Sequence, residues 1–278
     1  MYSWTAIGTT GERFSGFAPF VASVNDAGTV ALQAALHGGG TGVFTGIGEE
    51  VVRAAVPAVV AGTSSHPDVN TAGAMSFYGD LEAGGQGVFL LRDGRLETIA
   101  TTRGGFASIG PAGPTMNEAG VVAFRADRAP TVHGIFTWDG ATVRTVAQTG
   151  DRWSEFHGLP VIEERGAVVF RADRADGACG IYASDDGSVR TIAETGDVFE
   201  TLGPFPSADG SGTVAFAATL RAGGCGVFLA REDSISPVVD LEDAFASYRG
   251  ALVGGAGTVI RIATPRAGSL GLFAGPDP

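Results

Sequence analysis

The stretch Asn117-Glu118-Ala119-Gly120-Val121-Val122-Ala123-Phe124, followed ten residues later by Gly134-Ile135-Phe136, decides the fold of this chain. Its pattern is a glycine, a second glycine fourteen residues on, and then an apolar and an aromatic residue. The pattern occurs six times, with first glycines at Gly28, Gly73, Gly120, Gly166, Gly212 and Gly257 and second glycines at Gly42, Gly87, Gly134, Gly180, Gly226 and Gly271. Regular copies spread over the whole length indicate a repeat architecture.

One copy predicts four antiparallel strands joined by tight turns. Asparagine and glycine tolerate positive φ and mark hairpin turns, and β-branched and aromatic runs are typical of strands. In the third copy we expect an extended segment over 111–116, a turn over 117–120, a strand over 121–126, a polar loop over 127–133, a strand over 134–138, a turn at 139–140 and a strand over 143–147.

Six such copies predict an all-β fold, a six-bladed β-propeller with four antiparallel strands per blade. The last copy ends at Phe273-Ala274-Gly275, after its third strand. Trp4 to Gly8 resemble a fourth strand, so we expect this N-terminal strand to complete the C-terminal blade. Residues 1–278 would then form a single closed domain.

The turn segments resemble a known bacterial repeat family. Asn25-Asp-Ala-Gly, Asn70-Thr-Ala-Gly and Asn117-Glu-Ala-Gly are similar to the turns of the NxxGxxxF tandem-repeat proteins. The resemblance implies a propeller-like fold and carries over no catalytic residues. Many members of that family are secreted or anchored at the cell surface. We expect a cytoplasmic protein here, with a secreted protein whose signal has been removed as the alternative.

Composition narrows the classes of partner. The net charge is −12, and the eighteen basic residues, all of them arginine, are scattered singly. This disfavours nucleic acid and membrane surfaces as partners, and the lack of lysine excludes a Schiff-base mechanism. Cys179 and Cys225 provide no disulfide framework. Arg125, Arg128 and Arg144 recur as Arg171, Arg174 and Arg190, which predicts ion pairs between blades.

The four histidines are the strongest signal for a functional site. In a propeller the first strand of each blade lines the central channel, and His66 and His157 lie on first strands. His37 and His133 lie in loops between second and third strands, which open on the same face. Histidine titrates near neutral pH and is the commonest general acid or base. We expect no metal site and no cofactor, because the sequence lacks a closely spaced histidine pair.

Other residues join the histidines by strand parity, since side chains two apart on a strand point the same way. His66, Glu155, His157 and Tyr248 are the predicted catalytic residues. The predicted binding residues are Asp68, Arg249, Phe17, Phe20, Phe205, His37 and His133.

Two classes of function fit this pattern. The first is an enzyme that transforms a small molecule in the channel by acid–base chemistry, as a lyase, cyclase or isomerase. The alternative is a non-catalytic binding module for a carbohydrate or a protein. Mixed apolar and polar residues around one channel mouth are typical of a small-molecule site, which favours the enzyme.

Overall fold

The computed structural model describes residues 7–11, 13–17, 22–47, 50–150, 152–232, 234–238, 245–253, 259–265 and 271–274. From residue 245 onward it describes side chains only at 246, 251–253, 259 and 264. The chain divides into two compact units, residues 1–145 and 146–278. The described residues contain no helix that could cross a membrane.

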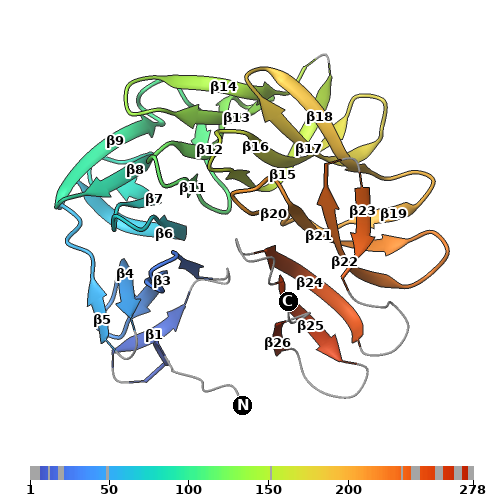
Figure 1. The fold of residues 1–278 in the computed structure, drawn as a ribbon. Coiled ribbons are helices and arrows are strands. Elements are labelled where there is room, and N and C mark those ends of the chain that lie inside the picture. The colour runs from blue at the N-terminus through green and yellow to red at the C-terminus, as the bar shows by residue number, and fades with distance from the viewer. Residues whose placement is uncertain are drawn as a thin grey trace. The chain divides into compact units, whose positions relative to one another are not determined.

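Unit 1 contains three antiparallel sheets of four or five strands, the last of which continues just past residue 145 (Figure 1). Their strands are β1 (Phe14–Phe17), β2 (Ser23–Val24), β3 (Val30–Leu36), β4 (Thr41–Ile47) and β5 (Glu50–Arg53); β6 (Val60–Val69), β7 (Met75–Leu81), β8 (Gln86–Arg92) and β9 (Arg95–Thr101); and β10 (Ser108–Ile109), β11 (Thr115–Met116), β12 (Val122–Ala129), β13 (Val132–Trp138) and β14 (Val143–Gln148).

Unit 2 contains three further antiparallel sheets, again built from sequence neighbours. Their strands are β15 (Trp153–Ile162), β16 (Val168–Arg174), β17 (Cys179–Asp185) and β18 (Ser188–Glu194); β19 (Phe199–Leu202), β20 (Ser207–Ala208), β21 (Val214–Leu220), β22 (Cys225–Arg231) and β23 (Ser234–Pro237); and β24 (Phe245–Val253), β25 (Val259–Pro265) and β26 (Gly271–Ala274). The all-β prediction and the hairpin order within each copy are confirmed.

One local prediction is wrong. The segment 127–133 is not a loop, because β12 runs on to Ala129 and β13 begins at Val132. Asp127 and His133 therefore pair across the two strands. Residues 4–6 of the predicted closing strand, Trp4 to Gly8, lie outside the described residues, and the single domain stays a prediction.

The repeated asparagine closes its own turn and ties it to the next sheet. Asn70 Oδ1 accepts a hydrogen bond of 2.9 Å from Ala74 N, and its Nδ2 donates to Glu118 O at 3.4 Å. In the first sheet, Asn25 Oδ1 accepts from Thr29 N and Asn25 Nδ2 donates to Asn70 O, both at 2.9 Å. The predicted turn role is confirmed, and the turn residue also links neighbouring sheets of unit 1.

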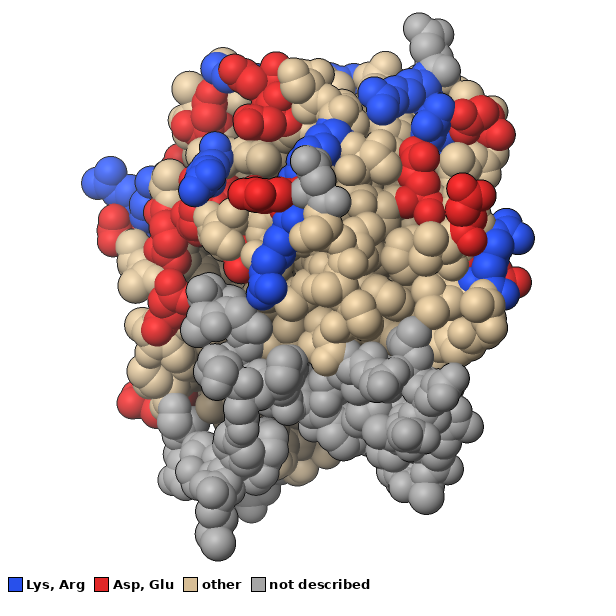
Figure 2. Space-filling view, turned by 45° about the vertical axis from the view of Figure 1, so that its right-hand side comes forward, with Lys and Arg blue, Asp and Glu red and all other residues tan. Residues whose placement is uncertain are grey.

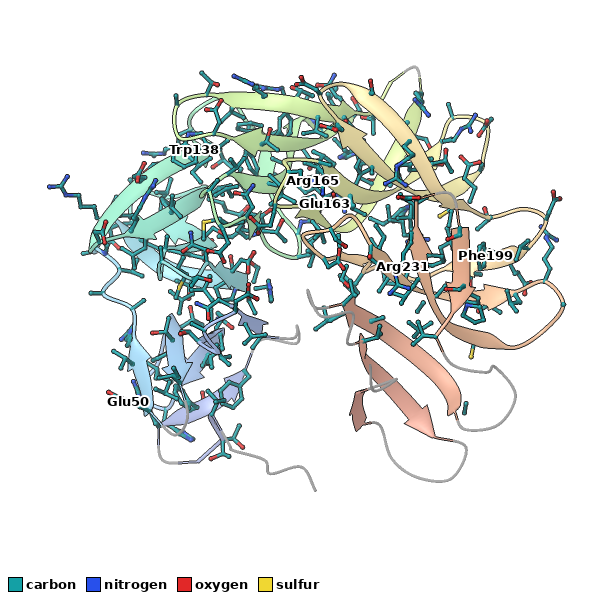
Figure 3. The ribbon with its side chains drawn as sticks, in the orientation of Figure 1. Glu50, Trp138, Glu163, Arg165, Phe199 and Arg231 are labelled. Atoms are coloured by element: carbon teal, nitrogen blue, oxygen red, sulfur yellow. The ribbon has the colours of Figure 1, made fainter. Side chains whose placement is uncertain are left out.

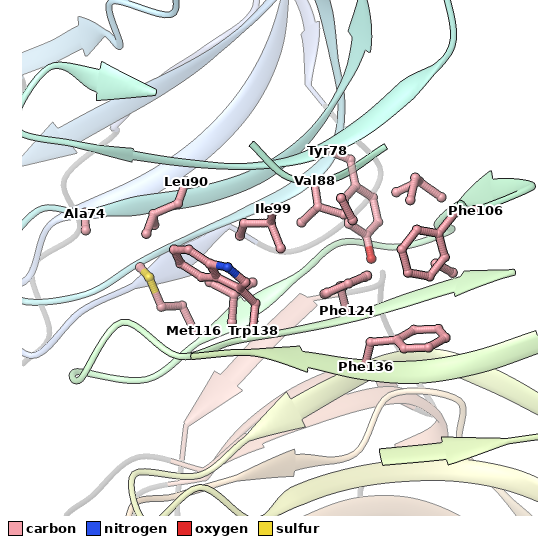
Figure 4. Close-up of a cluster of buried hydrophobic side chains, with 14 residues drawn as sticks. Ala74, Tyr78, Val88, Leu90, Ile99, Phe106, Met116, Phe124, Phe136 and Trp138 are labelled. Carbon is pink, nitrogen blue, oxygen red and sulfur yellow. The ribbon is translucent and has the colours of Figure 1, made fainter. Parts of the chain in front are cut away.

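The cores lie between consecutive sheets. Figure 4 shows one of them, in which Val88, Leu90 and Ile99 of the second sheet pack against Phe124 and Phe136 of the third. Tyr78 adds a polar link: its buried hydroxyl accepts from Arg125 N at 3.1 Å and donates to Arg125 O at 3.3 Å. Burial raises the pKa of Tyr78 well above its ordinary value. The second and third sheets thus share one core.

Two of the recurring arginines, Arg174 and Arg144, form ion pairs within a sheet. Arg174 pairs with Asp176 at 2.6 Å and with Glu194 at 3.1 Å, and all three belong to the fourth sheet or its hairpin. Arg144 pairs with Asp139 of its own hairpin at 3.1 Å. The prediction of ion pairs between blades is therefore wrong for Arg174 and Arg144, whereas Arg190 Nη1 donates to Glu232 O in the β22–β23 hairpin of the next sheet at 3.5 Å. Arginine and acidic side chains are interspersed on the face in Figure 2.

The first strand of several sheets bends at one repeat position. Five residues before the turn residue, Ser65 has φ 77°, Ala112 has φ 84° and Gly158 has φ 63°. The ladders of β6 and β15 lose register there, between Ser64 and Asp68 and between His157 and Val161. A side chain normally disfavours this left-handed backbone by about 1–2 kcal/mol. The bend therefore depends on tertiary contacts.

Gly158 tests that bend, because an added Cβ would lie 1.9 Å from Pro204 O. We expect Gly158→Ala to lower the free energy of unfolding by at least about 3 kcal/mol, combining backbone strain with a clash against main chain. Gly177→Ala is the matched control, since Gly177 has φ 91° and open space around it; it should cost about 1 kcal/mol. Urea unfolding measures both, and equal losses would contradict the packing argument.

Glu163 takes the turn position that asparagine holds in the first three copies. Glu163 is 6% exposed, and Figure 3 labels it beside Arg165 at the turn between β15 and β16. Burial raises the pKa of the Glu163 carboxyl above its ordinary value of 4.5, although Arg190 and Arg165 oppose the rise. A buried carboxylate at a position suited to a neutral amide destabilises the folded state once it ionises.

Glu163→Gln should therefore stabilise the protein at neutral pH. A raised native pKa means that the native state binds the proton more tightly, so wild-type stability falls as the pH rises from about 4.5 through the native pKa. At pH 7 we expect the variant to gain about 1 kcal/mol, and at pH 4 the difference should vanish. Thermal unfolding against pH measures this, with the exposed Glu200→Gln as control. A gain independent of pH would contradict it.

Candidate functional site

The candidate site in unit 2 is built around a histidine–aspartate pair. His157 lies on β15, and its Nε2 is 2.9 Å from Asp173 Oδ2 at the end of β16. The backbone register explains the contact, because Glu155 pairs with Asp173 and His157 with Arg171 in the antiparallel ladder. Both side chains are about one-third exposed, at 30% and 37%. They are accessible to a ligand yet fixed by two packed strands.

Arg171 and Cys179 complete the cluster. Arg171 lies directly opposite His157, and its Nε is buried without a hydrogen-bond partner among the described residues. Cys179 at the start of β17 lies opposite Asp173. Burial raises the pKa of the Cys179 thiol, and the hydrogen bond with the Asp173 carboxylate adds to the rise. The thiol is therefore suited to donating a hydrogen bond and poorly suited to acting as a nucleophile.

Asp173 carries the negative charge of this site. Burial raises the pKa of its carboxyl, but hydrogen bonds from His157 and Cys179 outweigh burial, so the net pKa is lowered. Asp173 is therefore ionised at neutral pH. An ionised carboxylate on Nε2 fixes the imidazole orientation and favours the tautomer that carries its proton on Nε2. Nδ1 is then the nitrogen that can take up a proton.

Two predicted site residues lie beside this pair. Glu155 is two residues from His157 on β15, and its Oε1 accepts from Phe156 N at 2.9 Å. The Phe205 ring approaches the backbone at Gly158, since the Cβ position of Gly158 lies 3.4 Å from Phe205 Cδ1. The structure thus brings His157, Glu155 and Phe205 into one part of unit 2.

A related pair occurs in the third sheet. His133 Nδ1 is 2.7 Å from Asp127 Oδ1, and the Ser108 hydroxyl donates to Asp127 Oδ2. Asp127 occupies the repeat position that Asp173 occupies in the fourth sheet. Aspartate lies between serine and histidine here, so the order of contacts is not that of a nucleophilic triad.

His66 and Asp68 lie together on the bent part of β6. Asp68 Oδ2 accepts from Met116 N at 2.7 Å, and Oδ1 accepts from Ser23 Oγ and from Val69 N. Burial raises the pKa of Asp68, while Ser23 and the nearby His66 oppose the rise. Asp68 joins first-strand segments of three sheets. Simple strand parity is wrong here, because the bulge between Ser64 and Asp68 interrupts the alternation.

The remaining predicted residues are scattered or undescribed. His37 lies in the β3–β4 turn, where its N donates to Arg13 O at 3.4 Å. Phe17 is 39% exposed and packs on Phe14 with ring centroids 5.3 Å apart. Phe20 and the side chains of Tyr248 and Arg249 lie outside the described residues. Within the described part of the chain, no group of three or more potential ligands could hold a metal ion.

Sequence reasoning missed the partners of His157. Arg171 was recognised only as a recurring residue, and Asp173 matches Asp127, which lay at the start of the predicted loop over 127–133. The available signal was their spacing, since Arg171 and Asp173 are two residues apart and point to one face of β16. Only the strand register could place them opposite His157 and Glu155.

Comparison with known proteins shows the fold. No family model matches the chain, and no curated protein matches it. Among solved structures, oligogalacturonate lyase from Vibrio parahaemolyticus aligns over 95% of this chain and 78% of its own, with 10% identity and a TM-score of 0.66. SapL1 lectin in complex with alpha methyl fucoside aligns over 95% and 94%, with 9% identity and a TM-score of 0.55.

A gluconolactonase from Xanthomonas campestris is also similar, over 96% of this chain and 88% of its own, at 13% identity and a TM-score of 0.54. The chain therefore has an all-β fold of antiparallel sheets like those of propeller-like proteins. At these identities the likeness defines the fold class alone, and the chemistry must be argued from the site.

Proposed function

We propose that this protein is an enzyme that acts on a small carboxylate-bearing molecule by acid–base chemistry, on the scaffold of a six-bladed β-propeller. The observation that carries the proposal is the 2.9 Å contact between His157 Nε2 and Asp173 Oδ2, with Arg171 opposite His157. A base held by an ionised carboxylate, next to a guanidinium, suits removal of a proton adjacent to a bound carboxylate.

In the proposed reaction, His157 Nδ1 takes a proton from the carbon next to the substrate carboxylate. Arg171 binds that carboxylate and stabilises the negative charge that develops on it. Glu155, beside His157 on β15, is the candidate for the second proton transfer, either to a leaving group or back to carbon. The first outcome is a lyase reaction and the second an isomerase reaction.

The catalytic role is tested with His157→Gln and, as control, Glu82→Gln in the exposed turn between β7 and β8. Initial rates on a panel of hydroxy acids, sugar acids and oligouronides should fall by about 10²–10⁴-fold for His157→Gln and stay unchanged for the control. Nitrogen NMR shifts should place the neutral-imidazole proton on Nε2, and Asp173→Ala should abolish that preference. A full rate in His157→Gln would contradict the assignment of His157 as the catalytic base.

The second candidate is a binding module. The observation in its favour is repetition, because Asp127–His133 and Asp173–His157 place an aspartate–histidine pair at the same aspartate position of two sheets. Repeated sites are typical of lectins, and a lectin is among the similar structures. Two bound ligands per chain without turnover would favour the binding module, whereas one ligand and turnover would favour the enzyme.

Closure of six blades by the N-terminal strand is the structural part of the proposal. Gly11 N donates to Phe14 O at 3.0 Å, as Gly150 N does to Trp153 O and Gly196 N to Phe199 O at 2.9 Å. Ile7 packs on the core of the first sheet, as Ile99 packs on that of the third. The segment before Phe14 therefore resembles the end of a fourth strand, which supports the expected link to β26.

Deleting residues 2–6 tests this closure while keeping Ile7 in place. We expect faster amide exchange in β26 and a lower melting temperature, because β26 would lose its outer neighbour. Deleting residues 276–278 is the control and should change neither. Hydrogen-exchange mass spectrometry measures the effect, and unchanged protection of β26 in the first variant would exclude closure by this strand.

A further inference from the structure

The first sheet ends differently from the second and the fourth. Its fourth strand, β5, pairs with β4 only from Phe44 to Ile47. In the second and fourth sheets the equivalent pairing extends back to Gly87 and Gly180, which match Gly42 of the first sheet. Figure 3 labels Glu50 at the start of this short strand. Ala54 N still donates to Val43 O at 3.0 Å, but Thr41 and Gly42 at the beginning of β4 have no partner in the β4–β5 ladder.

Arg53 stands where the second, third and fourth copies have a threonine. Arg53 pairs with Phe44, as Thr98 pairs with Phe89 and Thr191 with Tyr182. Its Nη2 donates to Thr41 O at 3.2 Å. The matching carbonyl in the second sheet, Gln86 O, instead accepts from a backbone amide, Thr102 N at 2.9 Å. The Arg53 guanidinium thus donates the hydrogen bond that a backbone amide donates in the second sheet.

A pocket of about 340 Å³ lies at this point, between β4, β5 and β6. This volume is at the small end of the range for ligand pockets, about 300–1,000 Å³. Its lining residues are Thr41, Gly42, Val43, Arg53, Ala54, Ala55, Val56, Val60, Ala61, Gly62 and Thr63. Small aliphatic side chains form one wall, and Arg53 supplies the charge.

The polar groups of the pocket leave the arginine charge unneutralised. Thr41 Oγ1 donates to Thr63 O at 2.8 Å and accepts from Thr63 N at 3.0 Å, so these two residues satisfy one another. The partner of Arg53 is a neutral carbonyl, and the described part of the chain provides it with no ion pair. Asp80 lies behind Gly62, with its Oδ2 3.5 Å from the Cβ position of Gly62. The Asp80 carboxylate would repel a second negative charge on a ligand.

We propose that the Arg53 pocket, defined by these lining residues, binds a small monocarboxylate with a short aliphatic body. The guanidinium of Arg53 pairs with the carboxylate, and Ala54, Val56 and Val60 contact the aliphatic part. This site lies in unit 1 and uses no residue of the His157 site in unit 2. The proposal for this pocket is therefore independent of the proposed reaction at His157.

The test compares isobutyrate with isobutyramide, which has the same shape and no charge. Amide resonances of the full-length protein are followed by two-dimensional NMR as each compound is added. We expect isobutyrate to shift Gly42 and Gly62, and isobutyramide to bind at least about tenfold more weakly, because it cannot pair with Arg53.

Arg53→Thr introduces the residue of the second, third and fourth copies and should abolish the shifts while keeping the rest of the spectrum. Arg53→Gln gives a second test should the threonine variant fail to fold. Arg95→Gln, at an exposed arginine of β9, is the control and should bind as the wild type does. Equal binding of the amide, shifts that persist in both Arg53 variants, or no shift of Gly42 and Gly62 with isobutyrate would each overturn the proposal.

Discussion

The side-chain amide of the turn asparagine is the interaction on which the sheets of unit 1 depend. Its oxygen closes the hairpin of its own sheet, and its nitrogen reaches a carbonyl of the next turn. An aspartate cannot make both contacts, because a carboxylate only accepts hydrogen bonds. In unit 2, Asp209 Oδ1 accepts from Thr213 N and Ser211 N within its own turn. The link between sheets there comes from elsewhere, as in the hydrogen bond from Val253 N to Ser207 Oγ.

Polar chemistry gathers where this framework allows variation. The aromatic pair of each core is fixed by packing, as in Phe124 with Phe136 and Phe216 with Phe228. The residues at the ends of the second and third strands face fewer constraints. Asp127 and Asp173 share one of these positions, whereas His133 and Cys179 occupy another, at which the copies differ. One repeat unit therefore combines a rigid centre with strand ends that can carry different side chains.

The glycine spacing was enough to predict the strands and turns, because positive φ at Gly28, Gly73 and Gly120 is a local requirement that few residues meet. The bend in the first strands could not be predicted in this way. Ser65 and Ala112 adopt the same left-handed backbone without being glycine, and contacts with the adjacent sheet impose it. Strand parity therefore failed beyond Ser64. The partners of His157 could not be predicted, because they depend on the register of two strands, which the spacing does not give. Arg53, in contrast, can be recognised in the sequence, since three other copies have a threonine at its position: Thr98, Thr145 and Thr191.

The bend also affects how easily another chain could pair with the edge of a sheet. β6 and β15 are edge strands of their sheets, and a long straight edge presents unpaired amides and carbonyls that another chain can join. A left-handed residue halfway along each strand turns these groups out of line, and the first strands of neighbouring sheets are broken into pairs such as β10 and β11. A foreign strand then finds no more than a few residues in register. The left-handed backbone at Ser65 and Ala112 thus limits the length of straight, open edge in these two sheets.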